Sequence, residues 1–151
     1  MRRSLLAIAT LLLSVAISKA HEKSPTVQTM VQAAPEKIKK AALAMFVPQG
    51  YSIDLDTASQ LKVSRTWSSE ETNSYNTDHW TLEPVSNCRD VRTLILLPAD
   101  HATSVTMHWD TVCHVDGGWK IWHLDDEKDI KSMQTTLADL KAKIEVPDQR
   151  H

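Results

Sequence analysis

The feature that most constrains the fold of this chain is the spacing of its two cysteines, Cys88 and Cys113. The run between them is typical of two strands joined by a turn. If the turn centres on Asp100 and His101, opposed residues have position numbers that sum to 201, as 88 and 113 do. The spacing therefore predicts a cross-strand disulfide, which fixes the register of this hairpin and sorts its residues onto two faces.

The first twenty residues have the pattern of a signal peptide. Arg2 and Arg3 precede an apolar run from Leu5 to Ile17, and Ser18-Lys19-Ala20 provides small residues at the cleavage positions. This apolar run is too short to cross a membrane comfortably. We therefore expect residues 1–20 to be removed and the mature protein to be periplasmic or secreted, where a pair of cysteines is normally oxidised.

The length and charge of the remaining chain limit the classes of function. Cleavage would leave 131 of the 151 residues, with 14 basic and 19 acidic side chains and a net charge of −5. The basic residues form no continuous stripe, so we expect no nucleic-acid partner, and no membrane contact after cleavage. We expect a signal peptide at 1–20, a flexible lead at 21–34, a single domain at 35–147 and a tail at 148–151.

The apolar periodicity predicts an α+β domain. Side chains at three- and four-residue steps predict helices near 35–47 and 126–145, one at each end of the domain. Alternation of apolar and polar residues predicts strands at 51–55 and 60–67, and residues 68–78 resemble a polar loop. With the hairpins that follow, we expect an antiparallel meander of five to six strands, flanked by the two helices and containing the disulfide-stapled hairpin.

A second hairpin is predicted at Gly117 and Gly118, because glycine readily adopts the positive φ of a tight turn. This turn pairs residues whose numbers sum to 235, so that Cys113 opposes Trp122. Together, the two registers place one set of apolar side chains on the face that carries the disulfide: Leu94, Leu96, Val105, Met107, Trp109, Trp122 and Leu124. We expect this face to pack under one or both helices.

The opposite face of the predicted sheet carries three polar side chains of one strand, His108, Asp110 and His114, and the second register places His123 diagonal to Asp110 and His114. Diagonal neighbours in a sheet lie about 7–8 Å apart. Three imidazoles and a carboxylate could therefore hold zinc or copper, or Asp110 could orient a general base. The alternative is a solvated face on which these side chains bind nothing.

The same face is also more apolar than a purely solvated one. The predicted ligand or partner patch consists of Val91, Ile95, Val112, Trp119 and Ile121. Its occupant is an unknown protein or a small apolar ligand, unless other segments of the chain cover it. The C-terminal helix follows heptad spacing over only two heptads, so packing on the sheet is favoured over a dimer seam, and we expect a monomer or a weak dimer.

Common catalytic signatures are missing from the sequence, which contains no GxSxG, no glycine-rich phosphate loop and no HExxH. A disulfide would also remove the cysteine nucleophile. We therefore assign no catalytic residue and expect no cofactor, which favours a protein that is not an enzyme. His21, the expected mature N-terminus, is a separate candidate for copper chelation, with no second ligand assigned to it.

The stretch from Val115 to Leu124, VDGGWKIWHL, resembles the closing hairpin of SnoaL-like, NTF2-type domains, in which such a turn links two long strands of a curved sheet. The resemblance implies a ligand pocket, with or without catalysis, and transfers no functional residue. The chain departs from that family in lacking several N-terminal helices and in having a long helix after the last strand. In order of preference, the sequence predicts an exported non-enzymatic binding or interaction domain, an NTF2-like ligand-pocket protein, or a metal-binding protein.

Overall fold

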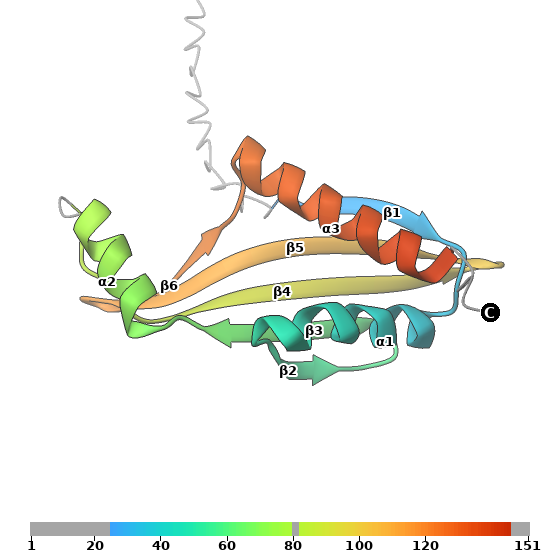
Figure 1. Cartoon of the computed structure of the whole chain (residues 1–151), viewed down its shortest axis with the longest axis horizontal. Helices are drawn as coiled ribbons and strands as arrows, with labels where there is room; N and C mark the ends of the chain where they lie inside the picture. Colours follow the sequence, from blue (N-terminus) through green and yellow to red (C-terminus); the bar gives the residue numbers. More distant parts are fainter. Residues whose placement is uncertain (1–24, 80–81, 146–151) are drawn as a thin grey trace, which may run out of the picture.

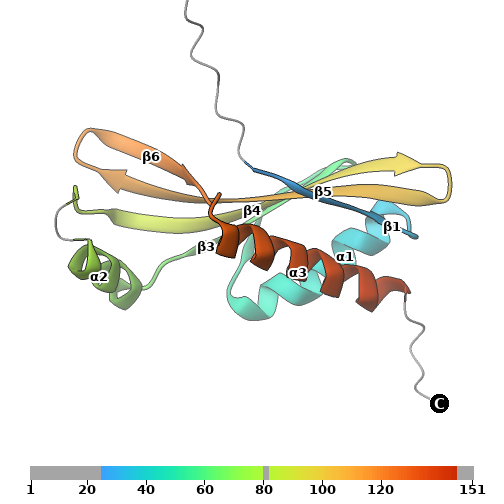
Figure 2. The same ribbon diagram turned by 90° about the horizontal axis from the view of Figure 1, so that it is seen from above.

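The computed structural model describes residues 25–79 and 82–145, which form a six-stranded antiparallel sheet with three α-helices on one face (Figures 1 and 2). This confirms the predicted α+β class. The predicted signal peptide, His21 and the tail at 148–151 lie outside the described residues. The elements in chain order are β1 (Val27–Val31), α1 (Pro35–Phe46), the 3-10 helix η1 (Val47–Gln49), β2 (Ser52–Asp56), β3 (Gln60–Thr66), α2 (Ser69–Asp78), β4 (Ser86–Ala99), β5 (Ala102–Val115), β6 (Gly118–His123) and α3 (Glu127–Glu145).

The long strand β5 organises the sheet. On one side it pairs with β4, which continues to β3 and then to β2. Its other side is shared, because β1 pairs with Thr103–Met107 of β5 and β6 pairs with Asp110–Val115. The first and last strands of the sheet therefore lie one after the other along the same side of β5.

The predicted hairpin between β4 and β5 is confirmed. Position numbers of opposed residues sum to 201 from Arg89 and Val112 down to Ala99 and Ala102, and Cys88 is bonded to Cys113. The turn residue Asp100 has a positive φ, as a two-residue hairpin turn requires. The register shifts only beyond the disulfide, at Asn87, whose φ of 50° marks a bulge.

The predicted register of the second hairpin is wrong by two residues. Opposed residues sum to 233, with Val115 opposite Gly118 and Cys113 opposite Lys120. Asp116 and Gly117 therefore form the turn, because Asp-Gly also satisfies a tight turn and leaves Gly118 to pair. A shift of two residues preserves the face of each side chain, so Trp122 still packs with the disulfide.

Two segments are more ordered than their composition suggests. The predicted flexible lead at 21–34 contains β1, which buries Val27 and Val31 and pairs with residues 72–80 positions away in sequence. The polar loop predicted at 68–78 is instead α2. Its sequence signal is a capping box, in which Ser68 accepts a bond from the Glu71 backbone N–H and the Glu71 carboxylate accepts one from the Ser68 N–H.

We call the helix-covered face of the sheet the inner face. Side chains on β3, β4 and β5 form cross-strand rows on it, each row two residues further along the strands. In order towards the disulfide, four of these rows are Leu61–Leu94–Met107, Val63–Arg92–Trp109, Arg65–Asp90–Thr111 and Trp67–Cys88–Cys113. The polar third row separates two apolar clusters.

The larger cluster, which we call the core half, lies under α1 and α3. It buries aliphatic and aromatic side chains from both helices and from the sheet, including Ile38, Phe46, Leu94, Met107, Leu137 and Leu140. The smaller cluster lies at the disulfide end, where Val85, Cys88, Cys113 and Val115 are buried. Figure 2 shows α1 and α3 together under one part of the sheet and α2 alone near the β5–β6 hairpin.

Candidate functional site

A pocket of about 300 Å³ lies at the disulfide end, between α2 and the strands β5 and β6. Its walls are mainly aromatic and aliphatic, and the hydroxyl-bearing Thr111 is its one polar contribution from the inner face of β5. The lining residues are Trp67, Tyr75, Val85, Thr111, Cys113, Trp122, His123 and Leu124. An apolar concavity with few polar groups is the usual form of a small-molecule site.

Tyr75 of α2 is the central wall of this region. Its ring tilts against Trp67 at 5.8 Å and stacks on His79 at 4.3 Å. It also lines a more open cleft of about 540 Å³ on the side of α2 that faces Arg65 and Asp90. The helix is therefore a partition with a cavity on each side.

Apart from the contact of Tyr75 with Trp67, the attachment of α2 to the sheet is polar. Its ten residues include none that is buried. Near its C-terminal end, the Asn76 amide bonds both backbone groups of Val85, donating to the carbonyl at 3.0 Å and accepting from the N–H at 2.8 Å. At its N-terminal end, Glu71 pairs with Arg65 at 2.8 Å. Two polar anchors therefore hold a helix whose apolar contact with the sheet is limited to Tyr75.

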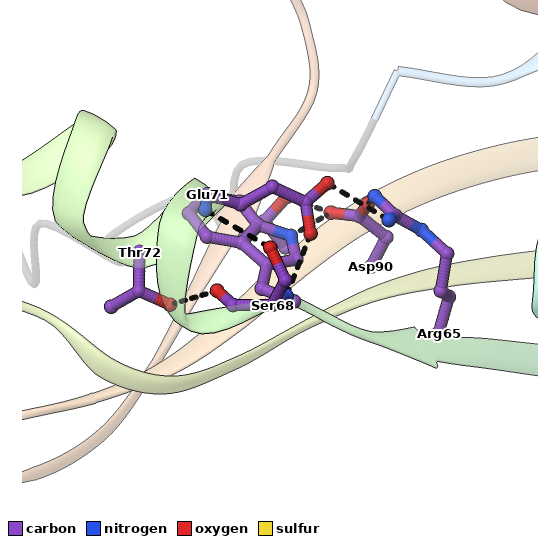
Figure 3. Close-up of polar contacts among 7 residues, drawn as sticks. Arg65, Ser68, Glu71, Thr72 and Asp90 are labelled. Carbon is purple, nitrogen blue, oxygen red and sulfur yellow. Dashed lines mark hydrogen bonds and ion pairs between the residues drawn. The ribbon is translucent and has the colours of Figure 1, made fainter.

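The anchor at Arg65 belongs to a network on the third inner-face row (Figure 3). Arg65 donates to Glu71 and to Oδ2 of Asp90, both at 2.8 Å. The other oxygen of Asp90 accepts bonds from the Trp67 indole at 2.7 Å and the Thr111 hydroxyl at 3.2 Å. Asp90 thus fixes side chains that line both cavities.

The charges of this network stabilise one another. Burial lowers the pKa of Arg65, but its hydrogen bonds to Glu71 and Asp90 outweigh that effect and raise the pKa above its usual range. The pKa of Glu71 is lowered by the Ser68 backbone N–H and then by the Arg65 guanidinium. Both groups are therefore charged at neutral pH, which maintains the anchor.

The candidate metal ligands lie on the uncovered outer face and are only partly brought together. Asp110 accepts from Nδ1 of His123 at 2.7 Å and lies 3.7 Å from Nε2 of His108. His123 is directly opposite Asp110 rather than diagonal to it. His114 lies four residues further along β5, edge-on to Trp119. Over residues 25–79 and 82–145, no three His, Cys, Asp or Glu side chains are grouped to hold a metal ion.

The predicted apolar patch is divided between two places on the outer face. Trp119 and Ile121 are 61% and 60% exposed, and Ile121 pairs with the half-buried Val112. Ile95 lies opposite Thr106, eight residues along β5 from the partner of Trp119, or about 26 Å at the rise of a strand. Val91 is only 3% exposed. The exposed part of the patch is therefore confined to the β5–β6 hairpin.

Comparison of the sequence with protein-family models finds no match, and no curated protein matches it. Within the described part of the chain, no helix is both long and apolar enough to cross a membrane. The geometry of the molecule therefore provides the argument about function.

Sequence reasoning assigned the disulfide, Trp122 and Leu124 to the correct face but did not find the pocket. The pocket depends on α2, whose polar composition predicts a loop. The signal available was the capping box Ser-x-x-Glu at Ser68–Glu71. No local signal indicated that Arg65 and Asp90 pair, since they are 25 residues apart in sequence.

Proposed function

We propose that this chain is an exported, non-enzymatic binding protein that holds a small, largely apolar ligand in the pocket between α2 and the β5–β6 hairpin. The observation that carries the proposal is the set of three aromatic walls, Trp67, Tyr75 and Trp122, around about 300 Å³ of space. This volume is at the lower end of the range for small-molecule sites.

The construction of the pocket supports this role. Its floor includes Cys113, whose disulfide joins β5 to β4, and one of its walls is Tyr75 of α2, a helix anchored by polar contacts. A covalently fixed floor keeps the aromatic walls in place, while polar anchors can open at a lower cost than a packed apolar interface. An apolar ligand would replace water against the aromatic rings.

Export is supported by two independent features. The N-terminal sequence has a basic segment, an apolar run and small residues in the order of a signal peptide. The only two cysteines of the chain form a disulfide, which persists in oxidising compartments such as the periplasm. We infer that the mature protein is periplasmic or secreted.

The binding test uses a neutral apolar fluorophore, N-phenyl-1-naphthylamine, titrated with the purified mature protein. We expect saturable enhancement of its emission with a stoichiometry of one. Substitution Tyr75→Ala should weaken binding by about tenfold or more, because it removes a central aromatic wall. Trp122→Leu provides a second pocket variant that retains apolar bulk.

The control is Trp119→Ala, three residues from Trp122 on the same strand and on the opposite face. This variant should bind the fluorophore as the wild type does. An absence of saturable binding to the folded wild-type protein would contradict the proposed function.

A second candidate function is recognition of a partner protein by an apolar strip on the β5–β6 hairpin, made of the exposed Trp119 and Ile121 and the half-buried Val112. The specific observation in its favour is the exposure of two large apolar side chains, Trp119 and Ile121, side by side on one strand. The variants Tyr75→Ala and Trp119→Ala separate the two candidate functions. Partner binding by this strip should be lost in Trp119→Ala and retained in Tyr75→Ala.

A further inference from the structure

The second inner-face row contains an arginine that has aromatic neighbours but no carboxylate partner. The Arg92 guanidinium carbon lies 4.2 Å from the ring centre of Trp109, 4.4 Å from that of Tyr51 and 5.1 Å from that of Phe46. Among the described residues, no acidic side chain lies within ion-pair distance of it. Arginine tolerates such a site because its guanidinium is weakly hydrated and stacks on rings.

The adjacent acidic residue is already occupied. Asp90 is two residues from Arg92 on β4, but its oxygens accept bonds from Arg65, Trp67 and Thr111. Burial lowers the pKa of Arg92. The charge interaction and hydrogen bond with the Tyr51 side chain, together with the charge of Asp90, partly offset this effect. One donor of the guanidinium is hydrogen-bonded to the Tyr51 side chain, and no carboxylate of the described chain accepts a bond from the others.

A buried donor without an acceptor lies beside it. The indole Nε1 of Trp109 is buried and has no hydrogen-bond partner within the described residues. It belongs to the ring on which Arg92 stacks, and Trp109 is directly opposite Arg92 in the sheet. A buried N–H without an acceptor is unfavourable and uncommon in native proteins, so its presence points to an acceptor that binds there.

The position of this row relates it to the pocket. Thr111 and Asp90 form the next row towards the disulfide, and Thr111 lines the pocket. Successive rows on one face are separated by about 7 Å, which is two residues of strand rise. A ligand whose apolar body contacts Trp67 and Trp122 can therefore place an acidic group near Arg92.

We propose that the ligand is an amphipathic carboxylate, such as an aromatic carboxylic acid or a short fatty acid. Its anionic group binds Arg92, and its apolar body fills the disulfide-end pocket. This inference rests on the proposed function. A carboxylate fits because it presents two acceptor oxygens to the planar guanidinium, and a charge-assisted bond is stronger than a neutral one.

The test compares two probes of matched shape, 2-naphthoate and its neutral analogue 2-naphthamide, each measured by displacement of N-phenyl-1-naphthylamine. The wild-type protein should bind the carboxylate about tenfold more tightly than the amide, the factor expected for one charge-assisted bond. Arg92→Met keeps an apolar chain beside the rings and should abolish this preference, so that the two probes bind with about equal affinity. Arg92→Lys, which keeps the charge without the planar fork, should give an intermediate ratio.

The matched control is Arg89→Met, an exposed arginine on the opposite face of the same strand. It removes the same charge and should retain the tenfold preference. If the amide binds as well as the carboxylate, or if Arg92→Met retains the preference, the carboxylate inference is overturned while the pocket remains. If neither probe nor the fluorophore binds, the proposed function fails as well.

Discussion

The two ends of the inner face are held together by different means. Within the described residues, the core half buries seventeen apolar side chains between α1, α3 and the sheet, whereas the disulfide end buries four, two of which are the bonded cysteines. Beside this smaller apolar cluster, the disulfide end has a covalent bond, an ion-pair network and a helix without a buried residue. Most of the buried apolar surface that stabilises the fold therefore lies in one half of the molecule, and the other half keeps an unfilled pocket.

The row of Arg65, Asp90 and Thr111 is the boundary between these regions. Its side chains pair with one another across three strands and orient Trp67 towards the disulfide end. Because buried polar groups must be satisfied, this row prevents the two apolar clusters from merging into one. The pocket exists because the cluster beyond the row is too small to fill the space under α2.

The largest expected effect follows from damage to the core half. Phe46→Ala should lower the free energy of unfolding by about 3–5 kcal/mol, because it leaves a cavity at a side chain that is 1% exposed. Urea unfolding monitored by circular dichroism measures this change. The adjacent Val47→Ala, at a side chain 53% exposed, should change it by less than about 0.5 kcal/mol. Equal effects of the two substitutions would refute the assignment of the core.

The next largest effect concerns the covalent staple. Replacing both Cys88 and Cys113 by alanine should lower the free energy of unfolding by about 3–4 kcal/mol in the chain-entropy model, since the bond closes a loop of 25 residues. Hydrogen exchange should show that the loss of protection is greatest in α2 and β6. A greater loss of protection in α1 and α3 than in α2 and β6 would contradict the claim that the disulfide mainly stabilises its own end of the molecule.

A smaller effect is expected at the start of α2. Ser68→Ala removes the cap and should cost about 1 kcal/mol of stability, read most clearly as faster amide exchange within α2. Ser69→Ala, one residue later and exposed, provides the control and should leave exchange unchanged. The idea of a separately anchored helix fails if both variants behave alike.

The smallest effect is a dependence of α2 on pH. Because the pKa of Glu71 in the folded state is lowered, its pairing with Arg65 is fully present above the ordinary carboxyl pKa of about 4.3. The stabilisation is lost as the pH falls through the folded-state pKa. NMR shifts of α2 amides should therefore change in acid before those of α1 do. Glu71→Gln should abolish this early change, and an unchanged response in that variant would rule out the anchor as its origin.

The sequence predicted the architecture better than the site. The predicted register of the first hairpin, in which opposed position numbers sum to 201, is correct. The disulfide and a two-residue turn at Asp100 and His101 determine this register independently. The predicted register of the second hairpin, in which opposed position numbers sum to 235, is wrong. Asp116-Gly117 and Gly117-Gly118 are both good turns, and local sequence does not choose between them. Patterns of this kind identify elements and faces, whereas a choice between equivalent turns depends on tertiary packing.

The pocket was beyond prediction for a different reason. Its walls come from six separate elements or connections, and Trp67 and Trp122 are 55 residues apart in sequence. The pairing of Arg65 with Asp90 and the stacking of Arg92 on Trp109 depend on the register between strands, which periodicity alone does not provide. Such sites become visible only when the rows of the sheet are known.

The most direct test of the central claim is hydrogen exchange on the purified protein with and without saturating N-phenyl-1-naphthylamine. The account predicts that the fluorophore slows exchange in α2 and in β6, and leaves α1 and α3 unchanged. Slowing confined to α1 and α3, or to no element at all, would contradict the claim that the disulfide end is the binding region.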